Sequence, residues 1–136
     1  MKHTTIHDCK LIDLPKFLDR RGNLSVVEEL QHIPFEIKRV FWIYDVPGDS
    51  QRGEHAYRNT EEFIIALSGS FDVVLEDKNG NKQLFHLNRS YYGVYVPKMI
   101  WRRMENFSTN SLALVVTSTE YDANDYIRDY KEFRLL

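Results

Sequence analysis

Hydrophobic and polar positions alternate over short runs along most of the chain, which is the period of β-strands rather than of helices. The runs are rich in β-branched and aromatic residues, and turn-forming residues separate them at intervals of about ten residues. They cover residues 24–30, 37–46, 62–67, 71–76, 83–87, 92–96 and 112–118. This spacing predicts an all-β domain, built as an antiparallel sandwich or barrel.

Glycines mark two of the predicted turns. Asn79-Gly80 lies between two of the strand runs, and both residues tolerate the positive φ angles of a type I′ turn. We therefore predict a hairpin with a turn of that type. Gly69 breaks the chain directly after another apolar run.

Only the C-terminal segment has the pattern of a helix. Asp122 and Asp125 offer side-chain acceptors for a helix start. Apolar residues then follow at helical spacing, at Tyr126, Ile127, Tyr130 and Phe133. We predict one short helix over about residues 123–134, covering an open end of a barrel formed by about residues 5–118, within a single domain of residues 1–136.

Charge and composition narrow the class of protein. The 136 residues carry 18 Lys+Arg and 20 Asp+Glu, a net charge of −2, with 43% hydrophobic and 28% charged residues. A mean hydropathy of −0.46 agrees with a soluble globular domain. Phosphate-backbone binding needs a concentrated excess of basic residues, and no basic run occurs, so we expect no nucleic-acid partner. An anionic ligand must be held by a few placed arginines.

The cysteine count limits the possible disulfides and metal sites, and the N-terminal residues indicate the compartment. Cys9 is the single cysteine, which excludes an intramolecular disulfide and a cysteine-based zinc cage. The first residues contain no apolar stretch long enough for a signal peptide or a membrane span. We therefore expect a cytoplasmic protein with no membrane partner.

The richest candidate chemistry lies in residues 52–62. On a strand, alternate side chains share a face, so His55 and Tyr57 are predicted to project to the same side and to form a polar pocket in the barrel. His55 is read either as a base, because its ordinary pKa is about 6.5, or as a core histidine with satisfied hydrogen bonds. Downstream, Trp101 and Arg102 follow a run that ends at Pro97.

These two segments resemble the paired motifs of the cupin superfamily, whose fold is a jelly-roll barrel, also called a double-stranded β-helix. The matching positions are His55, Tyr57, Glu62 and Gly69 in the first motif, and Pro97, Arg102 and Asn106 in the second. In metal-binding cupins, histidines stand where this chain has Tyr57 and Arg102. A guanidinium has no lone pair to give and repels a divalent ion, so we predict no metal and no other cofactor.

A second resemblance covers about 110 residues. Residues 19–24, 33–40, 52–56, 94–101 and 121–128 are similar, in the same order, to blocks of the sugar 3,4-ketoisomerases, which are also described as resembling the C-terminal part of the WxcM proteins. The resemblance implies a metal-free isomerase acting on a dTDP-linked 4-keto-6-deoxyglucose in the biosynthesis of bacterial surface sugars. The family motifs RGxHAHK and WHEM read here as RGEHAYR and WRRM, so that Tyr57 and Arg102 replace two histidines.

The implied reaction moves a ketone from C4 to C3 through an enediol or enediolate. It requires a base, a proton shuttle and donors to an oxyanion. We predict that His55 is the base and that Tyr57 relays protons. Two alternatives stay open at this point: a related keto-sugar epimerase with the same intermediate, and a sugar-nucleotide-binding cupin without catalysis.

The remaining predicted site residues are substrate contacts. They are Arg21, Arg39, Arg52, Glu62, Tyr95, Trp101 and Arg102. A diphosphate favours planar bidentate donors, which is why arginines dominate this set. Arg58 and Arg103, in contrast, are expected to form surface salt bridges. The apolar run 40–44 is hydrophobic on both faces of its strand, which predicts a homodimer, as the resemblance also implies.

Overall fold

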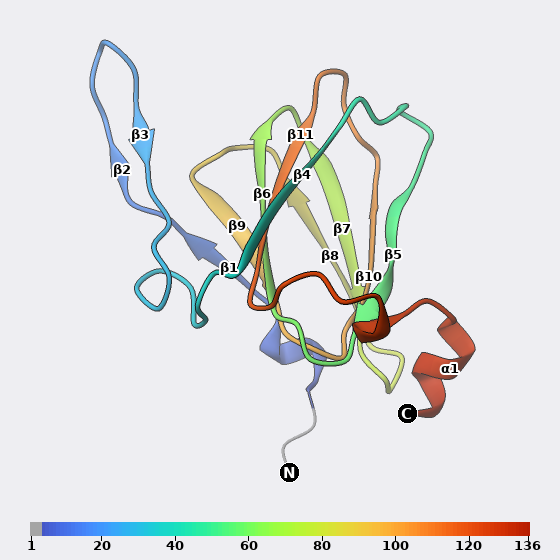
Figure 1. The fold of residues 1–136 in the computed structure, drawn as a ribbon. Coiled ribbons are helices and arrows are strands. Elements are labelled where there is room, and N and C mark those ends of the chain that lie inside the picture. Colours follow the sequence, from blue (N-terminus) through green and yellow to red (C-terminus); the bar gives the residue numbers. More distant parts are fainter. Residues whose placement is uncertain (1–3) are drawn as a thin grey trace.

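The computed structural model describes residues 4–136 and consists of two five-stranded antiparallel sheets packed face to face (Figure 1). Sheet 1 has the order β1 (Lys10–Asp13), β9 (Tyr92–Val96), β6 (Glu62–Ser68), β11 (Leu112–Thr117), β4 (Arg39–Tyr44). Sheet 2 has the order β12 (Tyr126–Ile127), β5 (Arg52–Tyr57), β10 (Trp101–Glu105), β7 (Phe71–Glu76), β8 (Lys82–Leu87). The predicted all-β cupin barrel is thereby confirmed.

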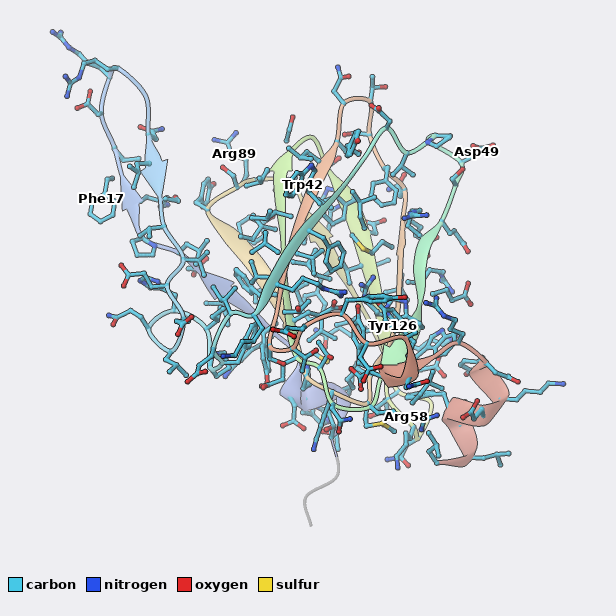
Figure 2. All side chains as sticks on the ribbon, viewed as in Figure 1. Phe17, Trp42, Asp49, Arg58, Arg89 and Tyr126 are labelled. Atoms are coloured by element: carbon cyan, nitrogen blue, oxygen red, sulfur yellow. The ribbon has the colours of Figure 1, made fainter. Side chains whose placement is uncertain are left out.

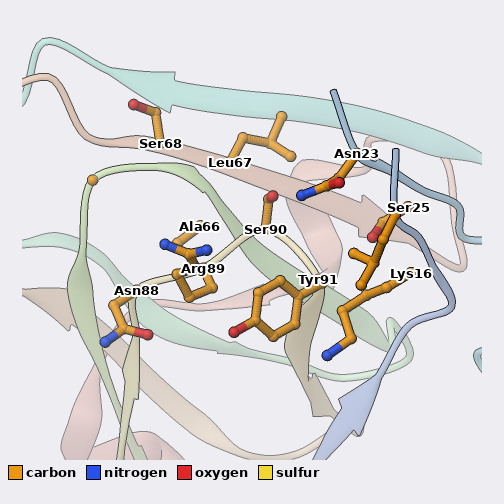
Figure 3. A pocket seen from close by; sticks show the side chains of 12 residues that line it. Lys16, Asn23, Ser25, Ala66, Leu67, Ser68, Asn88, Arg89, Ser90 and Tyr91 are labelled. Atoms are coloured by element: carbon orange, nitrogen blue, oxygen red, sulfur yellow. The ribbon is translucent and has the colours of Figure 1, made fainter. Parts of the chain in front are cut away.

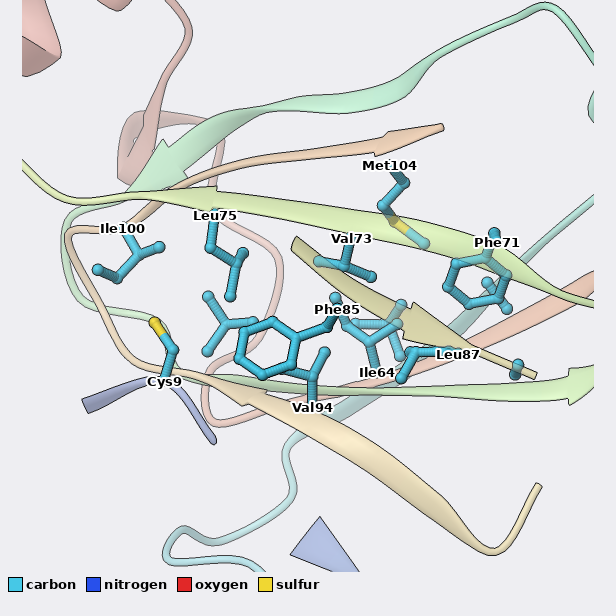
Figure 4. Close-up of a cluster of buried hydrophobic side chains, with 14 of the residues drawn as sticks. Cys9, Ile64, Phe71, Val73, Leu75, Phe85, Leu87, Val94, Ile100 and Met104 are labelled. Atoms are coloured by element: carbon cyan, nitrogen blue, oxygen red, sulfur yellow. The ribbon is translucent and has the colours of Figure 1, made fainter. Parts of the chain in front are cut away.

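The core lies between the two sheets, where every second residue of each strand points inward. Ile64 and Val94 of sheet 1 meet Val73, Leu75 and other apolar residues of sheet 2, as Figure 4 shows. Cys9 is buried at one end of this core, and burial raises the pKa of its thiol to about 12. The cysteine is therefore a small apolar packing residue.

A two-stranded arm projects from the barrel. It consists of β2 (Lys16–Phe17) and β3 (Leu24–Ser25), and Figures 1 and 2 show it extending away from both sheets, with Phe17 on it. The strand predicted over residues 24–30 is thus wrong beyond Ser25. The chain that follows lies instead against the outer face of sheet 1, where Ile33 and Phe35 are buried beside Phe63.

The β7–β8 hairpin is formed as predicted, but its turn differs. Of the central pair only Gly80 has a positive φ, of 89°, so the type I′ prediction is wrong. The Gly80 N–H donates to the Asp77 carbonyl at 3.1 Å, and the Asp77 carboxylate accepts from the backbone N–H groups of Asn79 and Asn81. An Asp side chain that supplies such acceptors favours a longer loop with a single left-handed glycine.

The C-terminal segment forms less helix than predicted. Residues 123–125 form a 3-10 turn (η2, Ala123–Asp125), Tyr126–Ile127 is the edge strand β12, and α1 covers only Tyr130–Leu135, capped by the Asp129 side chain. The other short 3-10 turn is η1 (Ile6–Asp8). The helix prediction failed at Tyr126 because pairing with β5 outweighed the local helical spacing. Among residues 4–136, no helix is long and apolar enough to cross a membrane.

Candidate functional site

Three neighbouring strands of sheet 2 bring the polar side chains of the site together. In the β12–β5 pair Tyr126 lies opposite Tyr57, and in the β5–β10 pair His55 lies opposite Arg102. The His55 and Tyr57 rings share one face, as predicted, with centroids 4.7 Å apart. The Tyr126 ring lies 4.8 Å from each of them, so three rings form one compact cluster.

This cluster forms one wall of a pocket of about 320 Å³ between β4 and β5. The lining residues are Phe41, Trp42, Ile43, Arg52, Gly53, Glu54, His55, Tyr57, Arg102, Tyr126 and Arg128. Four other hollows are larger, between about 470 and 620 Å³. Figure 3 shows the one of about 470 Å³, beside Lys16, Arg89 and Tyr91 at the base of the arm. None of the four is lined by a buried titratable residue of β5, so we place the candidate site in the smaller pocket.

His55 is buried and remains neutral. Its side chain is 5% exposed, and its Nε2 atom has no hydrogen-bond partner among residues 4–136. Burial, followed by the charges of Arg102, Arg128 and Arg39, lowers the pKa of the imidazole to about 2. A neutral imidazole with an unengaged ring nitrogen is able to accept a proton from a ligand in the pocket.

Arg102 and Glu62 form an ion pair between the two sheets. Both side chains are buried; the guanidinium Nε contacts Glu62 Oε1, and Nη2 donates to Oε2 at 3.2 Å. Burial raises the pKa of Glu62, and the Arg102 charge opposes that rise. Arg102 lines the pocket, whereas Glu62 lies behind it and does not.

Gly53 makes room for this guanidinium. A Cβ atom at Gly53 would lie 2.1 Å from Arg102 Nη1, and Gly53 has a φ of +65°, in the left-handed region. The Gly53 carbonyl also accepts from Nη1 at 3.4 Å. A side chain at this position would displace Arg102 or strain the backbone.

The two tyrosines of the cluster are linked through their hydroxyls. Tyr57 donates to the Tyr126 oxygen at 3.4 Å, and Arg39 Nη2 donates to the same oxygen at 3.4 Å. Burial raises the pKa of Tyr57 above its ordinary range, so its hydroxyl keeps its proton. Arg128 lies over the other side of the Tyr126 ring, 4.3 Å from its centroid.

The predicted substrate contacts divide into two groups. Arg52 and Arg102 line the pocket, and Arg39 stands behind Tyr126. Trp101, Tyr95 and Arg21 are not brought to it. Trp101 comes directly before Arg102 on β10, so its side chain points to the opposite face, where it packs against Phe133 of α1 at a centroid distance of 5.6 Å.

Tyr95 and Arg21 lie on other parts of the molecule. Tyr95 is on the outer face of sheet 1, where its hydroxyl donates to Glu61 beside the 620 Å³ hollow. Arg21 is on the arm, with its side chain 87% exposed and paired with Asp19. The expected surface salt bridges are confirmed: Arg58 pairs with Glu132, and Arg103 with Glu105.

The sequence reasoning missed Tyr126 and Arg128 as pocket residues. Both belong to a block that carried the family resemblance, but the predicted helix assigned them to a cover over the barrel end. Figure 2 shows Tyr126 beside the end of β5. The signal in the sequence was Asp125, directly before Tyr126. In the structure Asp125 anchors strand β12 through a hydrogen bond from the Asn59 N–H and does not cap a long helix.

The two-sheet barrel is the fold of the cupin-like sugar isomerases and epimerases. A dTDP-4-dehydrorhamnose 3,5-epimerase of Bacillus anthracis shares the fold at a TM-score of 0.78 and 16% identity. More specifically, residues 7–136 match the family model "FdtA: WxcM-like, C-terminal", and the chain belongs to that family.

Two relatives within this family are similar over nearly their whole length. A TDP-4-oxo-6-deoxy-α-D-glucose-3,4-oxoisomerase of Aneurinibacillus thermoaerophilus is 39% identical over 125 residues, 92% of this chain and 89% of that protein. A TDP-quinovose 3,4-ketoisomerase of Campylobacter jejuni has 43% identity and a TM-score of 0.91, covering 96% of this chain and all of that one.

A third relative was solved with ligands. A sugar 3,4-ketoisomerase of Thermoanaerobacterium thermosaccharolyticum, in complex with TDP, has 32% identity and a TM-score of 0.91, covering 95% of this chain and 93% of its own. A mutant of the same enzyme was solved with TDP-4-keto-6-deoxyglucose.

Proposed function

We propose that this protein converts a TDP-linked 4-keto-6-deoxyhexose into its 3-keto isomer. The observation that carries the proposal is His55, a neutral and buried imidazole whose Nε2 has no partner among residues 4–136, in a pocket with three arginines. The named activities of the related proteins support the same reaction and a nucleotide-sugar ligand.

The chemistry is a proton rearrangement without gain or loss of atoms. His55 accepts the proton from C3, the electron pair forms the C3–C4 double bond, and the C4 carbonyl oxygen becomes an enediolate oxygen. The proton then returns at C4 while the C3 hydroxyl loses its proton and becomes the ketone. Tyr57, whose hydroxyl is protonated, relays the proton by giving its hydrogen to the C4 oxygen and taking the hydrogen of the C3 hydroxyl.

The arginines of the pocket bind the diphosphate in this proposal. Arg52 and Arg128 line the pocket, and Arg102 lies deeper, held by Glu62. Burial is the first cause of the depressed pKa of His55, and the arginine charges are the second; a bound diphosphate offsets those charges and so raises the pKa of the imidazole relative to the protein without ligand. Arg21, Tyr95 and Trp101 have no part in this step.

The test is incubation of the purified protein with TDP-4-keto-6-deoxyglucose in D₂O, followed by NMR. We expect deuterium at the carbon next to the ketone and accumulation of the 3-keto sugar. Exchange with inversion but without a 3-keto product would favour an epimerase instead. A concentration-dependent rise of the melting temperature with TDP, but no exchange with any 4-keto-6-deoxy sugar, would favour a binding protein.

We further propose that the protein is a homodimer, working in the cytoplasm. One face of β4 exposes the large apolar side chains of Val40, Trp42 and Tyr44 by 46%, 58% and 61%. Figure 2 labels Trp42 on this strand. Sedimentation equilibrium should give twice the chain mass, and Trp42→Lys should shift the equilibrium toward monomer. A wild-type monomer at micromolar concentration would contradict this.

A further inference from the structure

We infer that the Tyr126 hydroxyl is a catalytic hydrogen-bond donor to the oxygen on which negative charge develops, with Arg39 as the residue that positions it. This inference rests on the proposed isomerisation and adds a residue to its machinery. Tyr126 is neither the predicted base, which is His55, nor the predicted proton shuttle, which is Tyr57.

The strand that carries Tyr126 is fixed in place. The Asp125 carboxylate accepts from the Asn59 N–H at 2.7 Å and from the Thr60 hydroxyl, and the Asp125 carbonyl accepts from the Arg58 N–H at 2.9 Å. These bonds connect the C-terminal segment to the chain that follows β5. They place Tyr126 opposite Tyr57 and beside His55, on the pocket wall.

The Tyr126 hydroxyl accepts two hydrogen bonds and keeps its own hydrogen for a further bond. A phenol hydroxyl has one hydrogen to give and lone pairs that accept. Its oxygen accepts from Arg39 Nη2 and from the Tyr57 hydroxyl, both at 3.4 Å. Among residues 4–136, no acceptor receives a hydrogen bond from the Tyr126 hydroxyl. The Tyr126 side chain lines the pocket. The hydrogen is therefore available to a ligand oxygen there.

The charges around the ring match a developing oxyanion. Arg39 stands at the hydroxyl, and the Arg128 guanidinium lies 4.3 Å from the ring centroid. Positive charge at these two points favours electron density on the phenol oxygen and on an anion bonded to it. Hydrogen bonds in a catalytic site are often long without ligand and shorten in the reacting complex, which fits the 3.4 Å contacts.

The chemical role follows from the reaction. When His55 takes the C3 proton, the C4 carbonyl oxygen gains most of a negative charge, and a donor aimed at that oxygen stabilises the transition state more than the ketone. Removal of one such donor typically lowers kcat about 10²–10³-fold. In the structure the Tyr57 hydrogen is donated to Tyr126, so Tyr57 relays a proton only after that bond breaks, whereas the Tyr126 hydrogen is available from the start of the reaction.

The experiment compares Tyr126→Phe with the matched variant Tyr121→Phe. Both keep their rings, and Tyr121 is a 62% exposed neighbour whose centroid lies 5.9 Å from that of Tyr126. For Tyr126→Phe we expect kcat for isomerisation to fall about 10²–10³-fold, with KM, the Kd of TDP measured by calorimetry, and the melting temperature changed little. Tyr121→Phe should leave kcat, KM and the Kd of TDP within about twofold of wild type, and the melting temperature should change little.

Each other result overturns the inference in a recognisable way. If wild type isomerises the sugar and Tyr126→Phe retains kcat within about threefold, Tyr126 is not a catalytic donor although the proposed function stands. If TDP affinity and melting temperature fall together with kcat, its role is structural. If wild type neither isomerises nor exchanges deuterium, the proposed function has failed, and the inference fails with it.

Discussion

Arg102 on β10 and Glu62 on β6 come from opposite sheets and meet as an ion pair, with side-chain exposures of 2% and 0%. This pair closes the interior of the barrel behind His55. It also keeps a positive charge next to the imidazole, where it favours the neutral form. The two positions thus combine a structural contact with control over the candidate base.

The role of His55 as base predicts a separation of catalysis from binding. His55→Asn should lower deuterium exchange next to the ketone by about 10²–10⁴-fold, because the proton acceptor is gone. TDP affinity should stay within a few-fold, since we propose that arginines, and not His55, hold the diphosphate. The measurements are NMR exchange rates and calorimetric titration, and equal exchange rates in wild type and variant would show that another residue is the base.

Tyr57→Phe should lose less activity than His55→Asn. Water can replace a hydroxyl that relays protons between two oxygens more readily than it can replace a base. Single-turnover rates of 3-keto sugar formation would measure the difference. A loss as large as that of His55→Asn, with unchanged TDP affinity, would assign Tyr57 a more direct part in proton abstraction.

The depressed pKa of His55 predicts how stability depends on pH. The unfolded chain takes up a proton at His55 as pH falls through about 6.5, whereas the folded protein does not until about pH 2. The unfolded state binds more protons in that window, so the free energy of unfolding should fall with acidification, by up to about 1.4 kcal/mol per pH unit from this group.

Urea unfolding at pH 7.5, 6.5 and 5.5 would measure this dependence. His55→Asn should lose less stability than wild type between pH 6.5 and 5.5. The exposed His7 is the matched control, and His7→Asn should follow wild type. Parallel pH profiles for wild type and His55→Asn would mean that His55 takes up its proton in the folded protein as readily as in the unfolded chain.

Loss of one partner of the buried ion pair should be costly. Glu62→Gln leaves the Arg102 guanidinium without a counter-charge, which typically costs about 3–5 kcal/mol. Glu62→Gln combined with Arg102→Met should recover much of that loss. Glu105→Gln, which breaks a half-exposed pair with Arg103, should cost less than about 1 kcal/mol. Similar losses for the single and double variants would show that the charges are not the reason.

Chelation should leave activity unchanged. Arg102 occupies a position that is a histidine ligand in metal-binding cupins, and it engages Glu62, which is a ligand there too. Isomerisation rates before and after dialysis against EDTA should agree, and elemental analysis should find less than stoichiometric zinc, iron or manganese. One transition ion bound per chain, with His55 among its ligands, would contradict the prediction.

Local pattern in the sequence determined much of this protein. The two-residue period of strands predicted the all-β fold, most strand positions and the shared face of His55 and Tyr57, because side chains alternate along a strand whatever it packs against. Residue chemistry predicted the surface pairs of Arg58 and Arg103.

Tertiary structure decided the contacts between segments that are distant in sequence. The spacing around Tyr126 is helical, yet β-pairing with β5 and the bonds of Asp125 to residues 59 and 60 made it a strand and brought its hydroxyl to the pocket. Trp101 and Tyr95 have residue types suited to a sugar site, but the face of the sheet on which each lies turned them away from it. The alternation of side chains along a strand determines which residues share a face. Only the packing of the sheets decides which other residues that face contacts.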